Sequence, residues 1–125
     1  MPPQNIYLVV EPMPPIAEDL ALSLSDGDPG GEVLVAATEA QALEAIQGRG
    51  PVVLAIVHNG PQDFLRSALG AALAERGARV VLIGDRAEEA PPHTEFAVLQ
   101  RPYDADHLMA LMAQALQPPD KVSGG

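Results

Sequence analysis

The run Pro51 to Gly60, PVVLAIVHNG, constrains the fold of this chain most strongly. Its unbroken apolar stretch would present apolar side chains on both faces of a strand, which is typical of a parallel sheet covered on two sides. The run ends in the polar pair His58-Asn59. Because open α/β sheets place functional residues at the carboxyl ends of their strands, His58 is the first candidate for a site residue.

Four further apolar segments read as buried strands. They are Ile6 to Val10, Glu32 to Ala36, Arg79 to Ile83 and Phe96 to Gln100. Each is short and rich in Val, Ile or Leu, and each is bounded by turn-forming or polar residues. Together with the central run, they predict five strands.

The segments between the first strands repeat apolar residues at helical spacing. We predict a helix that begins at Pro14-Pro15, ends by Ser25 and buries Ile16, Leu20 and Leu24. We predict a second helix that begins at the capping box Thr38 to Gln41 and faces the core with Ala40, Leu43 and Ile46.

The later helices differ in length. One continuous helix is predicted from Pro61 to Gly77, with Leu65, Leu69, Ala72 and Leu73 facing inward. The segment Gly84 to Glu95 contains two prolines, so we expect at most one helical turn there, around Ala87 to Ala90. A last helix, capped by Asp104, turns Leu108, Leu111, Met112 and Ala115 inward.

Strands that alternate with helices predict an α/β domain with a doubly wound five-stranded parallel sheet. The expected strand order is the flavodoxin-like 2-1-3-4-5, with a shortened fourth helix. We assign residues 5–116 to this single domain and 117–125 to a disordered tail. In this order one edge of the sheet carries Glu11, His58, Gly84 and Arg101.

Composition excludes several functions. The chain has 125 residues, 17 of them acidic and 7 basic, and its formal net charge is -10. This charge disfavours nucleic acid and anionic membranes as partners. The sequence has no cysteine and no apolar run of membrane-spanning length, so we expect a cytoplasmic protein.

Four stretches resemble the receiver domain of two-component response regulators. They are VVEPMPPIAEDLA, LAIVHNG, RVVLIGD and VLQRPYDADHL, each at the end of a predicted strand. The resemblance covers roughly Asn5 to Leu116, and it implies a signalling protein whose partners are a histidine kinase, another receiver or an identical subunit.

The resemblance also assigns positions in the family's phosphorylation pocket. The acidic pair falls at Glu11 and Pro12, the phosphoacceptor aspartate at His58, the hydroxyl residue at Gly84 and the lysine at Arg101. Only one carboxylate remains for Mg²⁺, which prefers oxygen ligands. No aspartyl phosphate can form at position 58.

We therefore expect a degenerate pseudo-receiver that acts by phosphorylation-independent protein-protein interaction, without a cofactor, a bound metal or enzymatic activity. In this interpretation Glu11 and Arg101 form an ion pair across the empty pocket. Tyr103 matches an aromatic position on the family's signalling face, where it either contacts a partner or packs against the neighbouring helix.

Two alternatives remain open. The first is a flavodoxin-like small-molecule-binding protein or enzyme that uses the crevice near His58, Asn59 and Asp85. The second is a phosphorelay through His58. The same histidine could be a metal ligand, or simply a polar strand end that points into solvent, and we favour the last interpretation. His93 and His107 do not have the spacing of a zinc site.

Overall fold

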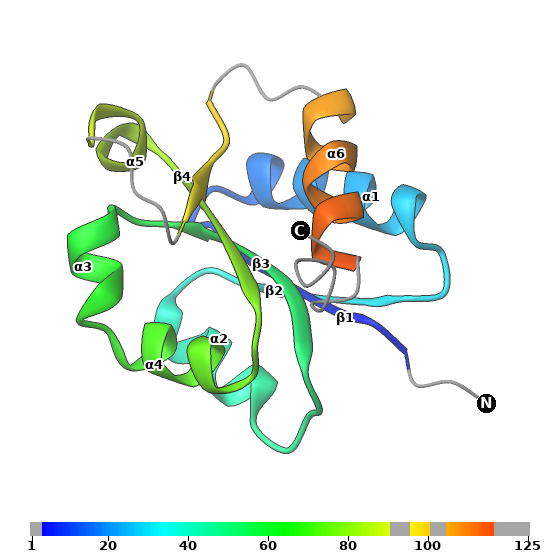
Figure 1. Ribbon diagram of the computed structural model, residues 1–125, viewed down its shortest axis with the longest axis horizontal. Coiled ribbons are helices and arrows are strands. Elements are labelled where there is room, and N and C mark those ends of the chain that lie inside the picture. The colour runs from blue at the N-terminus through cyan, green and yellow to red at the C-terminus, as the bar shows by residue number, and fades with distance from the viewer. Residues whose placement is uncertain (1–3, 91–95, 101–104, 117–125) are drawn as a thin grey trace, which may run out of the picture.

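The computed structural model describes residues 4–90, 96–100 and 105–116, and its centre is a five-stranded parallel sheet (Figure 1). The order of the strands is β2-β1-β3-β4-β5, which confirms the predicted fold class. The strands are β1 (Ile6–Val10), β2 (Glu32–Ala36), β3 (Val52–His58), β4 (Arg79–Ile83) and β5 (Ala97–Val98).

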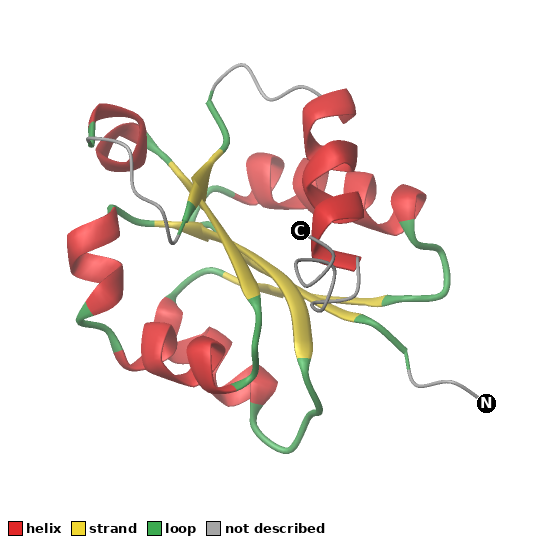
Figure 2. Ribbon diagram, in the orientation of Figure 1, coloured by secondary structure: helices red, strands yellow, loops and turns green. Residues whose placement is uncertain are grey.

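Helices cover both faces of the sheet (Figure 2). Helices α1 (Pro14–Gly27) and α6 (Ala105–Leu116) pack on one face. The other face is covered by α2 (Glu39–Ile46), α3 (Pro61–Leu65), α4 (Ala68–Glu75) and α5 (Asp85–Glu89). Helix α5 corresponds to the fourth helix predicted from the sequence, because the predicted third helix is divided into α3 and α4. Its five residues agree with the prediction that this helix is shortened.

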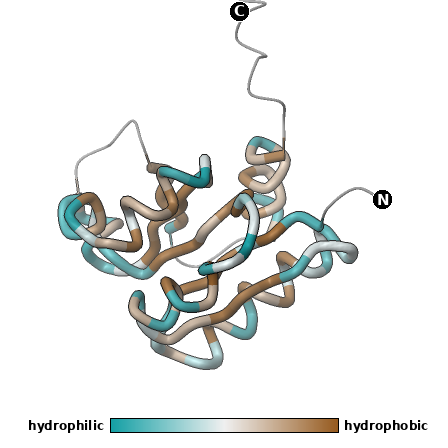
Figure 3. Tube along the Cα trace, turned by 90° about the horizontal axis from the view of Figure 1, so that it is seen from below, coloured by the Kyte–Doolittle hydropathy of each residue, from teal (hydrophilic) through white to brown (hydrophobic). Residues whose placement is uncertain are grey.

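Strand β1 shows how the sheet divides the core. All five of its residues are buried. Ile6, Leu8 and Val10 join the cluster under α2 and α4, whereas Tyr7 and Val9 join the cluster under α1 and α6. Successive side chains of a strand point to opposite faces, so an all-apolar strand supplies both layers. Figure 3 shows the strands as a mainly hydrophobic centre between helices of mixed character.

The prediction of one continuous helix from Pro61 to Gly77 is wrong, because the chain breaks between α3 and α4. Ser67 caps the second helix: its Oγ accepts a hydrogen bond from the Gly70 N–H at 2.9 Å and donates one to the Phe64 carbonyl at 2.7 Å. A Cβ at Gly70 would lie 2.3 Å from that carbonyl oxygen, so glycine is required here. Leu65 ends α3 and is 50% exposed, and Phe64 is buried in its place.

Two smaller predictions also need correction. Helix α1 continues two residues past Ser25, to Gly27, where a Cβ would lie 2.9 Å from the sulfur atoms of both Met109 and Met112 in α6. In α2, Ala42 and Ile46 are buried, whereas Ala40 is exposed. Ala40 is two residues from Ala42 and therefore lies on the opposite side of the helix.

The remaining elements follow the prediction closely. Thr38 caps α2 by accepting a hydrogen bond from the Gln41 N–H at 3.2 Å. Strand β5 is shorter than the predicted segment, although the Leu99 N–H still donates to the Leu82 carbonyl at 3.1 Å. Within the described ranges no helix is long and apolar enough to cross a membrane. The predicted tail and the cap at Asp104 lie outside the described residues.

Candidate functional site at the carboxyl edge of the sheet

Glu11 is the buried charged residue of this edge. It follows β1 directly, and its N–H continues the pairing with β2 by donating to the Ala36 carbonyl at 3.0 Å. Its side chain is fully buried. Carboxylate oxygen Oε2 accepts a hydrogen bond from the Met13 N–H at 2.9 Å, which ties the start of α1 to the end of β1. A buried carboxylate needs such partners to offset its lost hydration.

His58 supplies the second partner of this carboxylate. Its Nδ1 lies 2.8 Å from Glu11 Oε1. The imidazole is 42% exposed. Because the carboxylate only accepts hydrogen bonds, Nδ1 is the nitrogen that carries a proton in this contact, and Nε2 of the neutral ring then holds the lone pair. No described residue forms a hydrogen bond with Nε2.

Gly84 makes room for the ring. It precedes α5 with φ 105° and ψ 173°, a conformation that is essentially restricted to glycine. A Cβ at this position would lie 2.6 Å from His58 Nε2 and 2.8 Å from Cδ2. The imidazole thus leaves no room for a side chain at position 84.

Three of the four predicted pocket residues therefore meet: Glu11, His58 and Gly84. The fourth, Arg101, lies outside the described residues, as do Tyr103 and His93, so the predicted ion pair between Glu11 and Arg101 stays a prediction. His58 is half exposed but is not simply a strand end in solvent, because Glu11 holds it.

The contact between Glu11 and His58 was missed in the sequence, although the strand pairing could have revealed it. Val10 pairs with Val57 between β1 and β3, so the next residues of both strands, Glu11 and His58, are neighbours. In the same way His58 pairs with Ile83, which places Gly84 beside it. A residue-by-residue alignment of the expected strands would have predicted this cluster.

The described side chains of this edge provide few oxygen ligands for a hard cation such as Mg²⁺. Among the described residues, no group of three His, Cys, Asp or Glu side chains could hold a metal ion. Both oxygens of Glu11 already have partners. Magnesium takes oxygen ligands in octahedral geometry, and Glu11 would supply only a single carboxylate toward them.

Asn59 and Asp85, the other residues of the predicted crevice, are close to this edge but hold separate contacts. Asn59 Nδ2 donates to Glu39 Oε2 at 2.7 Å, and its Oδ1 accepts from the Gly60 N–H at 2.8 Å. Asp85 is the first residue of α5.

An apolar pocket lies elsewhere, between α3, α4 and the edge of the sheet. Its lining includes Phe64, Val80 and Phe96 and none of the crevice residues.

A second polar cluster lies at the opposite, amino edge of the sheet. The Tyr7 hydroxyl donates to Asp28 Oδ2 at 2.6 Å, and Asn5 Nδ2 donates to the same oxygen at 3.0 Å. Burial, and then the bond to Asp28, raise the pKa of Tyr7. The bond from Tyr7 is the main reason that the pKa of Asp28 is lowered. This cluster anchors the turn after α1 to β1.

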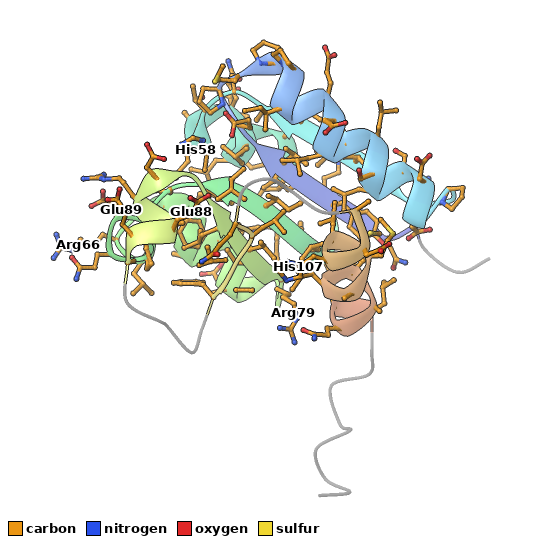
Figure 4. All side chains as sticks on the ribbon, turned by 90° about the horizontal axis from the view of Figure 1, so that it is seen from above. His58, Arg66, Arg79, Glu88, Glu89 and His107 are labelled. Atoms are coloured by element: carbon orange, nitrogen blue, oxygen red, sulfur yellow. The ribbon has the colours of Figure 1, made fainter. Side chains whose placement is uncertain are left out.

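The two histidines that the structure describes do not converge. His58 ends β3, and His107 lies on α6 in another part of the molecule (Figure 4). His107 is exposed. The figure therefore places these two histidines as independent side chains.

Comparison with known proteins defines the class of the fold. No model of a known protein family and no curated protein matches the sequence. Among solved structures, SdrG from Sphingomonas melonis Fr1 is similar with a TM-score of 0.69 and 27% identity, over 94% of this chain and 100% of that one. A sensor protein from Polaromonas sp. JS666 is similar with a TM-score of 0.64 and 25% identity, over 90% and 96%.

A response regulator receiver protein from Sinorhizobium medicae WSM419 is similar with a TM-score of 0.66, over 90% of this chain and 94% of that one. Its identity is 16%, so this likeness concerns the fold alone. The flavodoxin-like sheet and these neighbours together define the chain as a protein with the response-regulator receiver fold.

Proposed function

We propose that this chain is an atypical receiver domain that takes part in signal transduction through contact with another signalling protein. It does so without an aspartyl phosphate. The receiver fold and the 25% identity to a sensor protein from Polaromonas sp. JS666 support the signalling role. The lost phosphoacceptor supports the atypical mechanism.

The observation that carries the proposal is the contact between His58 and Glu11. His58 stands at the end of the central strand, where the resemblance puts the phosphoacceptor. Its imidazole contacts the one carboxylate that remains for magnesium and fills the space beside Gly84. The pocket is therefore occupied by the protein's own side chain, and this supports a scaffold used for binding.

The proposed partners are a histidine kinase, another receiver or a second copy of this chain. The net charge of -10 favours a partner with a basic contact surface. Tyr103 remains a candidate contact residue by its position after Arg101-Pro102. The proposal includes the absence of enzymatic activity and a cytoplasmic location, which fits a sequence without cysteine.

The small-molecule alternative has less support. It would use His58, Asn59 and Asp85, but the side chain of Asn59 is engaged with Glu39 and Gly60. The apolar pocket beside α4 has no lining residue from this crevice. No observation on the described residues favours a metabolite there over protein contact.

The test is an intact-mass measurement and a magnesium titration in the presence of acetyl phosphate. We expect that the wild type gains no base-labile acyl phosphate and does not respond to Mg²⁺. The double variant Pro12→Asp with His58→Asp restores a set of carboxylates, so we expect it to bind Mg²⁺.

The matched control is Pro12→Asn with His58→Asn, which has similar shape but no added charge and is expected to behave like the wild type. A base-labile phosphate on the wild-type protein, mapped to any carboxylate of this edge, would overturn the proposed mechanism. Thermal unfolding of every variant would establish that each is folded.

A further inference from the structure

The apolar pocket beside α4 is a feature that the proposed function does not use. It lies between α3, α4 and the edge of the sheet, and its volume is about 260 Å³. Every lining residue that the structure describes has either an apolar side chain or none. The pocket contains no residue of the edge that carries Glu11 and His58, nor of the crevice considered in the small-molecule alternative.

The pocket stays open because the elements around it are short or interrupted. Helices α3, α4 and α5 lie on the same side of the sheet (Figure 1). The chain breaks between α3 and α4, and the five-residue α5 contributes no residue to the lining. Strand β5 pairs with β4 through two residues, and Phe96, directly before it, is only partly buried. The opening is therefore built into the arrangement of this face.

We propose that this pocket binds a small, neutral aromatic molecule of one or two fused rings. The site goes beyond the signalling contact proposed above and does not depend on it. It shares no residue with the edge around His58, so either proposal can fail while the other holds.

The volume of the pocket limits the size of the ligand. A dry apolar cavity of about 150 Å³ is large enough to bind benzene, whereas pockets for drug-sized molecules begin at roughly 300 Å³. At about 260 Å³ the pocket has room for a ring somewhat larger than benzene. A nucleotide or another large cofactor would not be enclosed.

The lining requires a ligand without charge. No lining side chain within the described part of the chain can form an ion pair or a hydrogen bond. The Phe64 carbonyl is already satisfied, because it accepts hydrogen bonds from the Ser67 N–H at 3.0 Å and from Ser67 Oγ at 2.7 Å. Burying a charged group without a partner is costly, so an ionised carboxylate or amine is disfavoured in the pocket.

Two features of the lining favour a planar ring. Phe64 and Phe96 meet edge to face, with ring centroids 5.4 Å apart and an angle of 83° between the rings. Aromatic rings prefer such contacts, and a third ring can extend the arrangement. On the other side, Ala71 and Ala74 lie three residues apart on one face of α4 and form a wall of small side chains.

Leu65 supplies part of the driving force. It lines the pocket at the end of α3 and is 50% exposed. A bound ring would cover part of this side chain, and removing apolar surface from water favours binding. The ligand therefore gains both from the aromatic pair and from the exposed leucine.

The experiment is a titration of the full, isotopically labelled chain with indole, followed by proton-nitrogen NMR. We expect saturable shifts of the amide signals of Leu65, Ala71 and Ala74, while the signals of Glu11 and Gly84 stay in place. For a probe of roughly nine non-hydrogen atoms, we expect a Kd of about 1 mM or tighter.

Matched ligands test the predicted chemistry on the wild-type protein. Phenol and cyclohexanol are neutral near pH 7 and have the same ring size, so we expect phenol to bind about three- to tenfold more tightly. Benzoate carries a charge and should bind roughly tenfold more weakly than phenol, or less tightly still. Phe96→Leu should bring the ratio of phenol to cyclohexanol affinity toward one. Equal binding of phenol and cyclohexanol by the wild type, or of phenol and benzoate, would overturn the proposal.

The variant Ala74→Leu places a larger side chain in the pocket. We expect indole binding to weaken roughly tenfold or more, because the added atoms occupy the space of the ring. Ala40→Leu is the matched control, since Ala40 is exposed on α2 and does not line the pocket. Its Kd for indole should stay within about twofold of the wild-type value. Thermal unfolding establishes that both variants are folded.

Three outcomes would contradict the site itself. They are the absence of saturable shifts up to the solubility of indole, an unchanged affinity in folded Ala74→Leu, and shifts of the lining signals with protein concentration alone. The last result would mean that a second copy of the chain covers the pocket. None of these outcomes bears on the proposed function, whose test reads acyl phosphate and the response to Mg²⁺.

Discussion

At the scale of single residues, His58 and Gly84 form a matched pair. The ring occupies space that any side chain at 84 would need, and Gly84 adopts a conformation that only glycine tolerates. The choice of residue at one position therefore limits the choice at the other.

This pairing predicts that Gly84→Ala lowers the free energy of unfolding by about 2 to 4 kcal/mol, from backbone strain and from contact with the ring. Urea unfolding measures it. In a His58→Ala background the loss should be smaller, because the steric part is relieved and the backbone part remains.

Gly50 is the matched control for that substitution, since a Cβ there meets nothing within 4 Å. We expect Gly50→Ala to change stability by less than about 1 kcal/mol. Equal losses at positions 50 and 84 would show that the histidine ring is not what restricts Gly84.

The buried carboxylate of Glu11 has a structural role as well as its place beside His58. Glu11→Ala removes the acceptor for both the Met13 N–H and His58 Nδ1. We expect a loss of about 1 to 3 kcal/mol, because two hydrogen bonds to a buried carboxylate are lost. Glu18→Ala on the exposed face of α1 should stay within about 0.5 kcal/mol, and a similar effect of both substitutions in denaturant unfolding would contradict this account.

The pKa shifts of Tyr7 and Asp28 predict how the free energy of unfolding depends on pH. The pKa of Tyr7 is raised in the folded protein, so its contribution is fully present below its unfolded pKa of about 10 and is lost as pH rises above that value. The pKa of Asp28 is lowered, so its contribution is present above its unfolded pKa of about 3.9 and is lost as pH falls through the folded value.

Tyr7→Phe should therefore lower the free energy of unfolding near neutral pH by roughly 1 to 2 kcal/mol. It should also weaken the dependence of that free energy on pH in both the acid and the alkaline range. The measurement is the difference in unfolding free energy between wild type and variant across pH. A difference that stays constant from acid to alkaline conditions would mean that the Tyr7 to Asp28 bond does not control either titration.

At the scale of elements, the break between α3 and α4 makes glycine more favourable than alanine at position 70, against the usual preference of a helix. Alanine is favoured over glycine by about 1 kcal/mol in a helix interior. At Gly70, however, a Cβ would lie 2.3 Å from the Phe64 carbonyl oxygen. Backbone atoms cannot move aside as a flexible side chain can, so the contact outweighs the propensity.

We accordingly predict that Gly70→Ala destabilises the protein by more than about 1 kcal/mol, whereas the neighbouring exposed Ala71→Gly costs about 1 kcal/mol, as propensity alone requires. Thermal unfolding compares the two. Stabilisation by Gly70→Ala would mean that α3 and α4 form one continuous helix, as the apolar spacing alone suggests.

The same elements show what the sequence can and cannot predict. Strand positions and topology follow from apolar runs and from their alternation with helices, because burial on both faces leaves few alternatives. The helix break does not follow, since it depends on a close contact between Gly70 and Phe64. Apolar periodicity also does not decide which face of a short helix such as α2 is buried. Ala40 and Ala42 are the same residue type, and only the packing of the helix on the sheet buries Ala42 and leaves Ala40 exposed.

At the scale of the whole molecule, the candidate site arises where separate strands end together. The sequence predicts that Glu11, His58 and Gly84 share an edge, but not that the ring lies on the glycine and against the carboxylate. Those contacts depend on the register between β1, β3 and β4. The parallel strands bring their carboxyl ends to one edge of the sheet, and helices cover both of its faces (Figure 1).

The central claim is that this edge supports no acyl-phosphate chemistry. Its most direct test is a set of proton-nitrogen NMR spectra of the wild-type protein, recorded with Mg²⁺ and beryllofluoride, which mimics a phosphoryl group on a carboxylate. We predict no change in the signals of residues around His58 and Gly84, because no free carboxylate is available at position 58. Saturable, magnesium-dependent shifts at those residues would contradict the account.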